Sequence, residues 1–267
     1  MRQNGPQKPE GSASQARNTT ADRAIDVLLL FNERRPVLTA EEVAELLDMS
    51  RSTTYRYLLS LRSYGLVEEG DASGEFRLGT AVFQLARVAR KGLGLSEVAL
   101  PVMRELVDQT GESALLTRRS GAHVVCIERV ECSHSVRLSY ERGQVLPLHA
   151  GASAKVLLAY LKPAEIEAVL SAGPLPRYTE QTVTDPDALR AQLDAIRAAG
   201  YIVTDGEVDV GVRGVAAPIL GINGQALAGI SVAGPLFRLN DTMLPAVIAA
   251  VRAAAETISQ RLRNVDT

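Results

Sequence analysis

The segment from Asp48 to Val67 reads DMSRSTTYRYLLSLRSYGLV and has the most informative pattern in the chain. Between Met49 and Gly65 it holds arginines and hydroxyl-bearing residues but no acidic residue. One set of positions has the helical spacing i, i+3, i+4 and i+7, which predicts a buried stripe. This stripe consists of Thr54, Tyr57, Leu58 and Leu61.

The opposite face of the predicted helix presents donors for phosphate oxygens and base edges. These are Arg51, Ser52, Thr53, Tyr55 and Arg56. A helix is narrow enough to enter a major groove, so we interpret the segment as a DNA recognition helix. A solvated helix face is the alternative when this segment is taken alone.

The flanking sequence predicts a winged helix-turn-helix. Thr39 and Glu42 have the capping-box spacing, in which each side chain accepts a hydrogen bond from the other residue's backbone amide. Ser50 caps the next helix, which leaves a turn of about three residues between the two helices. An amphipathic segment from Ala24 to Phe31 supplies a third helix. After Gly65, two short apolar strands around a Gly/Asp/Ser turn predict a hairpin, the wing.

The overall charge argues against a protein that binds nucleic acid without sequence specificity. The chain has 29 Lys and Arg against 31 Asp and Glu, a net charge of −2. Any positive field must therefore be local, which favours specific binding by a dimer.

Length and composition set the broad class. The 267 residues predict two domains, and no apolar run reaches the ~18 residues of a membrane span. Residues 1–19 are polar and rich in Gly, Pro, Gln and Ser, which predicts a disordered tail rather than a targeting segment. Two cysteines and no secretion signal favour a cytoplasmic protein.

The domain boundaries follow from these patterns. We predict a winged helix-turn-helix over residues 20–79, a linker helix over 80–94 and a second domain over 95–267. The segment from Thr80 to Arg90 is apolar on more than one side, so it needs a partner outside its own domain. We expect it to pack against its mate in a homodimer.

The second domain has the pattern of an α+β fold with an antiparallel sheet. Strands are predicted at 114–118, 124–130, 135–140, 214–221 and 226–233, and helices at 95–109, 153–161, 163–170, 185–200 and 241–262. Asn223-Gly224 predicts a type I′ hairpin turn. Strand hairpins with helices laid on the sheet suggest a GAF- or PAS-like sensor domain.

Three groups of residues could carry metal or catalytic chemistry, and the first is a set of possible metal ligands. Cys126, Cys132 and His134, with His123 nearby, match no zinc spacing. Cys126 lies in an apolar run, which favours a buried structural thiol. We predict no metal site and no cofactor.

The second group, Ser153 and Lys155, could form a Ser–Lys nucleophile pair of the amidase type. No second serine or oxyanion-hole motif accompanies it. The third group, Asp205 and Glu207, lies in a Gly-rich loop where carboxylates are usually solvated. We therefore predict no catalytic residue.

Taken together, the motifs resemble the IclR family of bacterial transcription regulators. The matching segments are Met49–Leu61, Phe76–Gly79, Leu146–Lys155, Gly200–Tyr201, Gly211–Pro218 and Ser231–Pro235. The resemblance covers about residues 20 to 265. Two departures stand out, because the family often has Cys at the position of Gly214 and Ser at that of Ala233.

The resemblance implies a small organic effector held between the sheet and the loop–helix elements. The matching positions are Gly151, Ala152, Ser153, Asp205, Glu207, Gly214, Val215, Ser231 and Ala233. We expect a carboxylate whose acid group lies near Gly151–Ser153 and Ser231. Gly214 and Ala233 would make the pocket wider and less polar, which favours an aromatic or longer acid.

The expected protein is thus a ligand-responsive regulator that binds a double-stranded DNA operator as a homodimer or a dimer of dimers. Arg77 on the wing would add a phosphate contact. Repression of catabolic genes is favoured over activation. The alternatives are an amidohydrolase-like enzyme with a fused helix-turn-helix and a winged helix that binds proteins.

Overall fold

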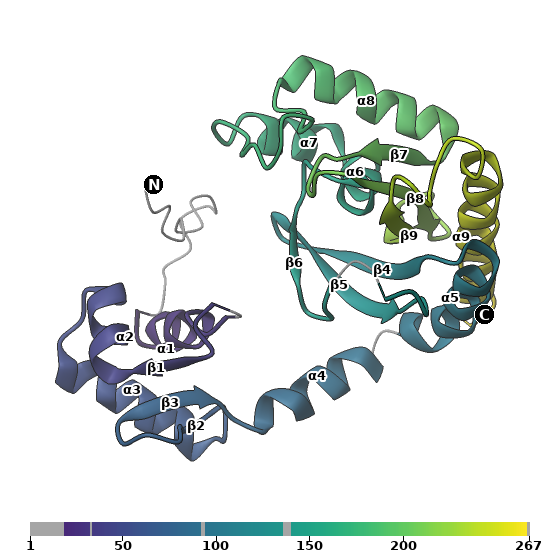
Figure 1. Ribbon diagram of the computed structural model, residues 1–267. Coiled ribbons are helices and arrows are strands. Elements are labelled where there is room, and N and C mark those ends of the chain that lie inside the picture. Colours follow the sequence, from purple (N-terminus) through teal and green to yellow (C-terminus); the bar gives the residue numbers. More distant parts are fainter. Residues whose placement is uncertain (1–18, 33, 92–93, 136–139, 266–267) are drawn as a thin grey trace. The chain divides into compact units, whose positions relative to one another are not determined.

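The computed structural model describes residues 19–32, 34–91, 94–135 and 140–265 (Figure 1). Its contacts divide the chain into two units, Met1–Gly92 and Leu93–Thr267. The tail expected at residues 1–19 lies outside the described residues except for Thr19. No helix within the described ranges combines the length and the apolar character that crossing a membrane requires.

The first unit is a winged helix-turn-helix, as predicted, followed by one further helix. Its elements are α1 (Thr19–Leu29), β1 (Val37–Thr39), α2 (Ala40–Leu47), α3 (Arg51–Ser63), β2 (Val67–Glu69), β3 (Glu75–Leu78) and α4 (Ala81–Lys91). The predicted hairpin is β2–β3, and β1 adds a third antiparallel strand on the other side of β3.

Local capping fixes where α2 and α3 begin. The Thr39 hydroxyl accepts from the Glu42 amide at 3.2 Å, and the Glu42 carboxylate accepts from the Thr39 amide at 2.7 Å. That second hydrogen bond is the main reason that the pKa of Glu42 lies below its usual value. Asp48 ends α2 with a left-handed φ of 50°, and Ser50 Oγ accepts from the Thr53 amide at 3.3 Å. The predicted caps and the short turn are confirmed.

The buried stripe of α3 anchors the helix in the core of the first unit. Thr54, Leu58 and Leu61 are buried, whereas Tyr57 is half-buried. They face a small core that includes Val27, Phe31, Leu38, Val43, Val67 and Phe76.

Replacing Leu58 with alanine should destabilise the first unit by about 2–5 kcal/mol, because a fully buried leucine leaves a cavity in a small core. Urea denaturation followed by circular dichroism would measure the change. The adjacent Leu59 is 37% exposed, so Leu59→Ala is a matched control that should leave stability nearly unchanged. Equal losses for the two variants would contradict the assignment of the buried face.

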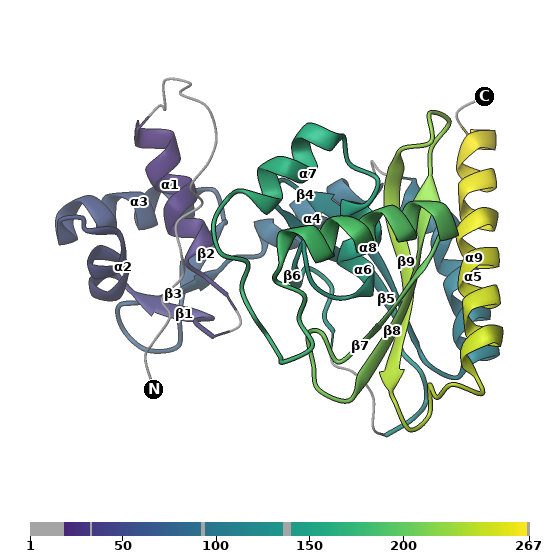
Figure 2. The same cartoon turned by 90° about the horizontal axis from the view of Figure 1, so that it is seen from above.

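The second unit is a six-stranded antiparallel sheet with helices on both faces (Figure 2). Its helices are α5 (Leu95–Thr110), α6 (Ala152–Leu158), α7 (Pro163–Leu170), α8 (Pro186–Ala199) and α9 (Leu244–Val265). Its strands are β4 (Ser113–Ser120), β5 (His123–Val130), β6 (Val145–Pro147), β7 (Ile202–Asp205), β8 (Val212–Leu220) and β9 (Ala226–Pro235). The strand order is β6-β5-β4-β9-β8-β7.

Alternation along the strands divides the second unit into two cores. Val215 and Ile219 of β8 point to the face that α5 and α9 cover, whereas Ala216 points to the face of α6, α7 and α8. Figures 1 and 2 show α5 beside α9 on one side of the sheet. The predicted α+β fold with an antiparallel sheet is confirmed.

Some local predictions need correction. The β8–β9 hairpin does not have a type I′ turn, because among the described residues only Asp48 and glycines have positive φ, and that turn needs it at Asn223 as well. The Gly224 amide donates to Gly221 O, and Gly224 has a φ of 70°, as in a three-residue loop that ends in a bulge. The strand predicted at 135–140 falls mainly on residues 136–139, which lie outside the described residues, and Ser135 and Tyr140 are not in strands.

Candidate functional site

The first candidate site is the outer face of α3. The side chains of Arg51, Ser52, Tyr55 and Arg56 are exposed there, opposite the buried stripe. Thr53 is half-buried, and its hydroxyl accepts a hydrogen bond from Ser50 Oγ at 2.8 Å. The structure therefore brings four of the five predicted contact residues to one open surface, while Thr53 also serves the cap.

The arginines of this unit differ in their partners. Arg51 lies 2.5 Å from Glu41, and Arg77 on the wing pairs with Glu68 at 2.9 Å and Asp71 at 3.5 Å. Arg56 has no ion pair or side-chain hydrogen bond with the residues that the structure describes. Its guanidinium is therefore available to a ligand without first leaving a carboxylate.

Tyr55 connects α3 to the wing sheet. Its ring lies edge-on to Phe76 of β3, with the centroids 6.0 Å apart and the planes at 80°. Because Phe76 is buried, this contact fixes the Tyr55 ring against the wing sheet.

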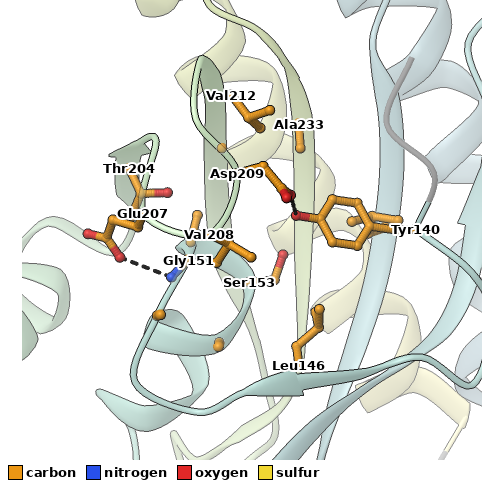
Figure 3. Close-up of a pocket in the computed structure, with 15 residues that line it drawn as sticks. Tyr140, Leu146, Gly151, Ser153, Thr204, Glu207, Val208, Asp209, Val212 and Ala233 are labelled. Carbon is orange, nitrogen blue, oxygen red and sulfur yellow. Dashed lines mark hydrogen bonds between the residues drawn. The ribbon is translucent and has the colours of Figure 1, made fainter. Parts of the chain in front are cut away.

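The second candidate site is a cavity between the sheet and α6 in the second unit (Figure 3). It is lined by Leu115, Tyr140, Leu146, Ala150, Gly151, Ala152, Ser153, Ala154, Thr204, Glu207, Val208, Asp209, Val212, Gly214 and Ala233. Its volume is about 40 Å³. A space of this size is too small for an organic acid with a ring, since a cavity known to hold benzene measures about 150 Å³.

The predicted effector residues divide between the cavity and other places. Gly151, Ala152, Ser153, Glu207, Gly214 and Ala233 line the cavity. Ser231 lies directly behind it, because its Oγ is 2.7 Å from Ser153 Oγ.

Asp205 and Val215 are directed away from the cavity by strand alternation. Val215 follows Gly214 on β8, so its side chain enters the core beneath α5 and α9. Asp205 follows Thr204 on β7 and pairs with Arg213 across the strands at 2.6 and 2.7 Å. Arg213 also binds Asp241 at 2.7 Å.

The two glycines in the wall permit close approach of neighbouring elements. Gly151 has a φ of 81°, and a Cβ there would lie 3.0 Å from Val208 Cγ2. A Cβ on Gly214 would lie 3.2 Å from Ala152 Cβ and 3.3 Å from Thr204 Oγ1. Ala152 thus takes up the space that Gly214 leaves, so the expectation of a wide pocket does not hold in this structure.

A buried ion pair forms one corner of the cavity. Lys155 is fully buried, and its Nζ lies 2.5 Å from Glu207 Oε1 and 2.7 Å from Gln192 Oε1. The other Glu207 oxygen accepts from the Gly151 amide at 2.9 Å (Figure 3). Burial lowers the pKa of Lys155, and Glu207 opposes this shift. The direct Nζ–Oε1 contact places the cation of Lys155 against the Glu207 carboxylate, so the two charges balance within the pair.

This arrangement does not support a Ser–Lys nucleophile pair, since Lys155 bonds to Glu207 and Gln192 while Ser153 bonds to Ser231. Sequence reasoning also left Glu207 as a solvated carboxylate, which is wrong, because Glu207 is only 7% exposed. The signal was present in Ala154-Lys155-Val-Leu-Leu-Ala159, where a lysine inside an apolar run needs a buried acceptor.

A second polar contact crosses the cavity and was missed in the sequence. The Tyr140 hydroxyl donates to Asp209 Oδ2 at 2.8 Å (Figure 3). Burial raises the pKa of Tyr140, and the Asp209 charge raises it further. The two residues are 69 positions apart, so no local pattern pointed to them.

The cysteines have the structural role that the sequence favoured. Cys126 is buried, and burial raises the pKa of its thiol to about 11. Cys132 is also buried, and its amide donates to Ser113 Oγ at 3.1 Å. Within the described ranges, no group of three or more His, Cys, Asp or Glu side chains could hold a metal ion.

Comparison with known domain families gives two matches. Residues 20–71 match the IclR helix-turn-helix domain. Residues 88–260 match the C-terminal domain of the bacterial transcriptional regulator IclR. Together these ranges include both candidate sites.

Two bacterial regulators are similar in sequence to this chain over most of its length. The chain is 37% identical to the HTH-type transcriptional regulator BhcR of Paracoccus denitrificans, over 89% of this chain and 85% of that protein. It is 33% identical to the HTH-type regulator KipR of Bacillus subtilis, over 93% of this chain and 98% of that protein.

Among solved structures, an IclR homologue of Microbacterium hydrocarbonoxydans in complex with 4-hydroxybenzoate has a TM-score of 0.81 and 32% identity. The alignment covers 92% of this chain and 99% of that one. A regulator of Silicibacter sp. TM1040 has a TM-score of 0.83 and 30% identity, over 91% of this chain and 96% of that one.

Proposed function

Because the chain belongs to the IclR family of bacterial transcriptional regulators, we propose that it is a repressor whose DNA affinity is set by a small organic acid. The outer face of α3 would read the operator, and the cavity beneath α6 would hold the acid. The effector would favour one relative placement of the DNA-binding units in a homodimer. The observation that carries this proposal is an apolar cavity with polar groups at its edges, in a chain that also presents a recognition helix.

The cavity lining favours a ring or a short aliphatic chain with an acid group. Leu115, Leu146, Val208 and Val212 supply apolar contact. Ser153 and Ser231 can turn their hydroxyls towards a carboxylate, and Glu207 does not repel it fully because Lys155 offsets its charge. The 4-hydroxybenzoate complex of the Microbacterium homologue supports an aromatic acid.

A thermal-shift screen of the full chain against aromatic and aliphatic carboxylates tests this proposal. A ligand that binds the folded state raises stability by RT ln(1 + [L]/Kd), about 2.7 kcal/mol at a hundredfold excess over Kd. Operator binding with and without each hit then shows whether the acid releases the DNA. Stabilisation by neutral alcohols but by no acid would refute the carboxylate.

Gly214→Leu should abolish acid binding in calorimetry, because its side chain would be directed at Ala152 and the cavity. Gly214→Ala should give an intermediate loss, since Ala152 must give way by only a few tenths of an ångström. DNA affinity without ligand should match that of the unchanged protein and serves as the folding control. Undiminished acid binding by the leucine variant would place the effector elsewhere.

The exposed apolar side chains of α4 are the reason to propose a homodimer. Phe83, Leu85 and Val88 are 76%, 60% and 64% exposed, although all three are large and apolar. A second copy of this helix would bury them, and a two-fold dimer would protect a palindromic operator with half-sites spaced by whole helical turns of ~10 bp.

Glutamate at Val82 or at Leu85 should dissociate the dimer, because each would bury a charge without a partner. Sedimentation velocity at micromolar concentration would show the change, with Leu85→Met as the control, because it keeps an apolar side chain of similar volume at the same position. A monomer that binds the palindromic operator tightly would contradict this role of α4.

A further inference from the structure

The cavity beneath α6 must open before any ring can enter it. Its volume is about 40 Å³, whereas a cavity of ~150 Å³ is known to hold benzene. Some lining side chain must therefore move when an effector of the proposed class binds.

The large buried side chains of the lining cannot move without breaking buried structure. Leu115 is a buried residue of β4, and Leu146 is a buried residue of β6. Glu207 is held by Lys155 and by the Gly151 amide. The remaining lining residues other than Tyr140 and Asp209 are small or β-branched.

Tyr140 is the exception. It has the largest side chain in the lining, is half-buried and belongs to no helix or strand. Its backbone carbonyl accepts from Arg129. Its ring packs against the edge of the core beneath α6 and makes a hydrogen bond to Asp209, an exposed residue of the 206–211 loop. Rotation of the ring out of the cavity would thus leave the backbone contact and the buried ion pair intact.

The Tyr140 side chain is itself a hydroxyl-bearing six-membered ring. We infer that Asp209 is the acceptor for a hydroxyl group on the effector, and that Tyr140 occupies this acceptor and the adjacent space when the effector is absent. This inference rests on the proposed binding of an effector in the cavity. It identifies Asp209 as a specificity-determining residue and Tyr140 as its internal competitor.

Charge fixes how such a ligand would lie. The Asp209 carboxylate repels a second carboxylate, so the acid group of the ligand would point away from it, towards Ser153 and Ser231. A hydroxyl at the opposite end of the ring would then meet Asp209. The selected class is a hydroxy-substituted aromatic acid, with hydroxyl and acid at opposite ends.

Calorimetry with the full chain and two matched ligand pairs tests the inference. The acid pair is 4-hydroxybenzoate and benzoate, and the neutral pair is 4-hydroxybenzamide and benzamide. Only the hydroxylated member of each pair can donate a hydrogen bond to the charged Asp209 carboxylate. It should therefore bind about tenfold more tightly than the member that lacks the hydroxyl. Asp209→Ala should abolish this preference in both pairs.

Tyr140→Phe keeps the ring but removes the bond that closes the cavity. It should therefore tighten the binding of both members of a pair by about tenfold. Val210→Ala, at an adjacent residue that is 81% exposed, is the control and should match the unchanged protein. Thermal unfolding of each variant would verify that it is folded.

The outcomes separate this inference from the proposed function. A hydroxyl preference that persists in Asp209→Ala, or weaker binding by Tyr140→Phe, overturns the inference. It is also overturned if no ring compound binds either the unchanged protein or Tyr140→Phe. Binding of the amides with an Asp209-dependent preference, but of neither acid, would refute the carboxylate effector and uphold the inference.

Discussion

Replacing Lys155 with methionine is expected to lower the free energy of unfolding of the second unit by about 3–5 kcal/mol. The change removes the cation from a fully buried pair and leaves the Glu207 carboxylate, 7% exposed, without it. One Glu207 oxygen would keep the Gly151 amide, but the other would lose its partner. Urea denaturation monitored by circular dichroism would give the difference from the shift in midpoint.

A double variant separates the loss of charge balance from the loss of packing. Lys155→Met combined with Glu207→Gln removes both charges and keeps an amide oxygen for the Gly151 N–H. It should recover most of the stability, because replacing a buried ion pair costs far less than breaking it. A single variant as stable as the unchanged protein would show that water reaches Glu207.

The parts of the fold that could be predicted from the sequence are those that depend on residues three or four positions apart. The capping box of Thr39 and Glu42 and the cap at Ser50 are complete within one helical turn. The buried stripe of α3 likewise needs only the helical period. Such features can be predicted before any tertiary contact is known.

Short strands were harder to predict because they carry too few residues to show a period. β1 and β6 have three residues each, and β7 has four. Their strand conformation comes from pairing with longer neighbours, such as β1 with β3. The Gly224 turn was misassigned for a related reason, because Asn-Gly fits more than one hairpin loop.

The cavity could be predicted as a region but not residue by residue. Its glycines and Ser153 lie in motifs that could be recognised in the sequence. Tyr140 and Asp209 form a hydrogen bond although they are 69 positions apart, so no local motif contains both. Val215 and Asp205 illustrate a different limit. Gly214 and Thr204 face the cavity, so alternation directs the next residue of each strand to the opposite face of the sheet. Deciding which of two neighbouring residues faces the cavity therefore required the exact bounds of the strands.

Replacing Arg56 with alanine is expected to abolish sequence-specific operator binding while the fold is retained. Arg56 is exposed on the outer face of α3 and binds no carboxylate in the described parts of the chain, so its loss breaks no ion pair there. A bidentate arginine–guanine contact is worth about 1–3 kcal/mol. Two half-sites would then lose about 2–6 kcal/mol, a drop in affinity of roughly 30-fold to more than 10⁴-fold.

Fluorescence anisotropy on an operator selected from random DNA, at one fixed salt concentration, would measure this loss. Arg56→Lys keeps the charge but not the planar fork, so it should retain nonspecific binding and lose most of the discrimination between sequences. Arg62→Ala is the matched control, because Arg62 lies near the end of the same helix and pairs with Glu69. If Arg56→Ala binds the operator as tightly as the Arg62 variant, then α3 does not read bases through Arg56.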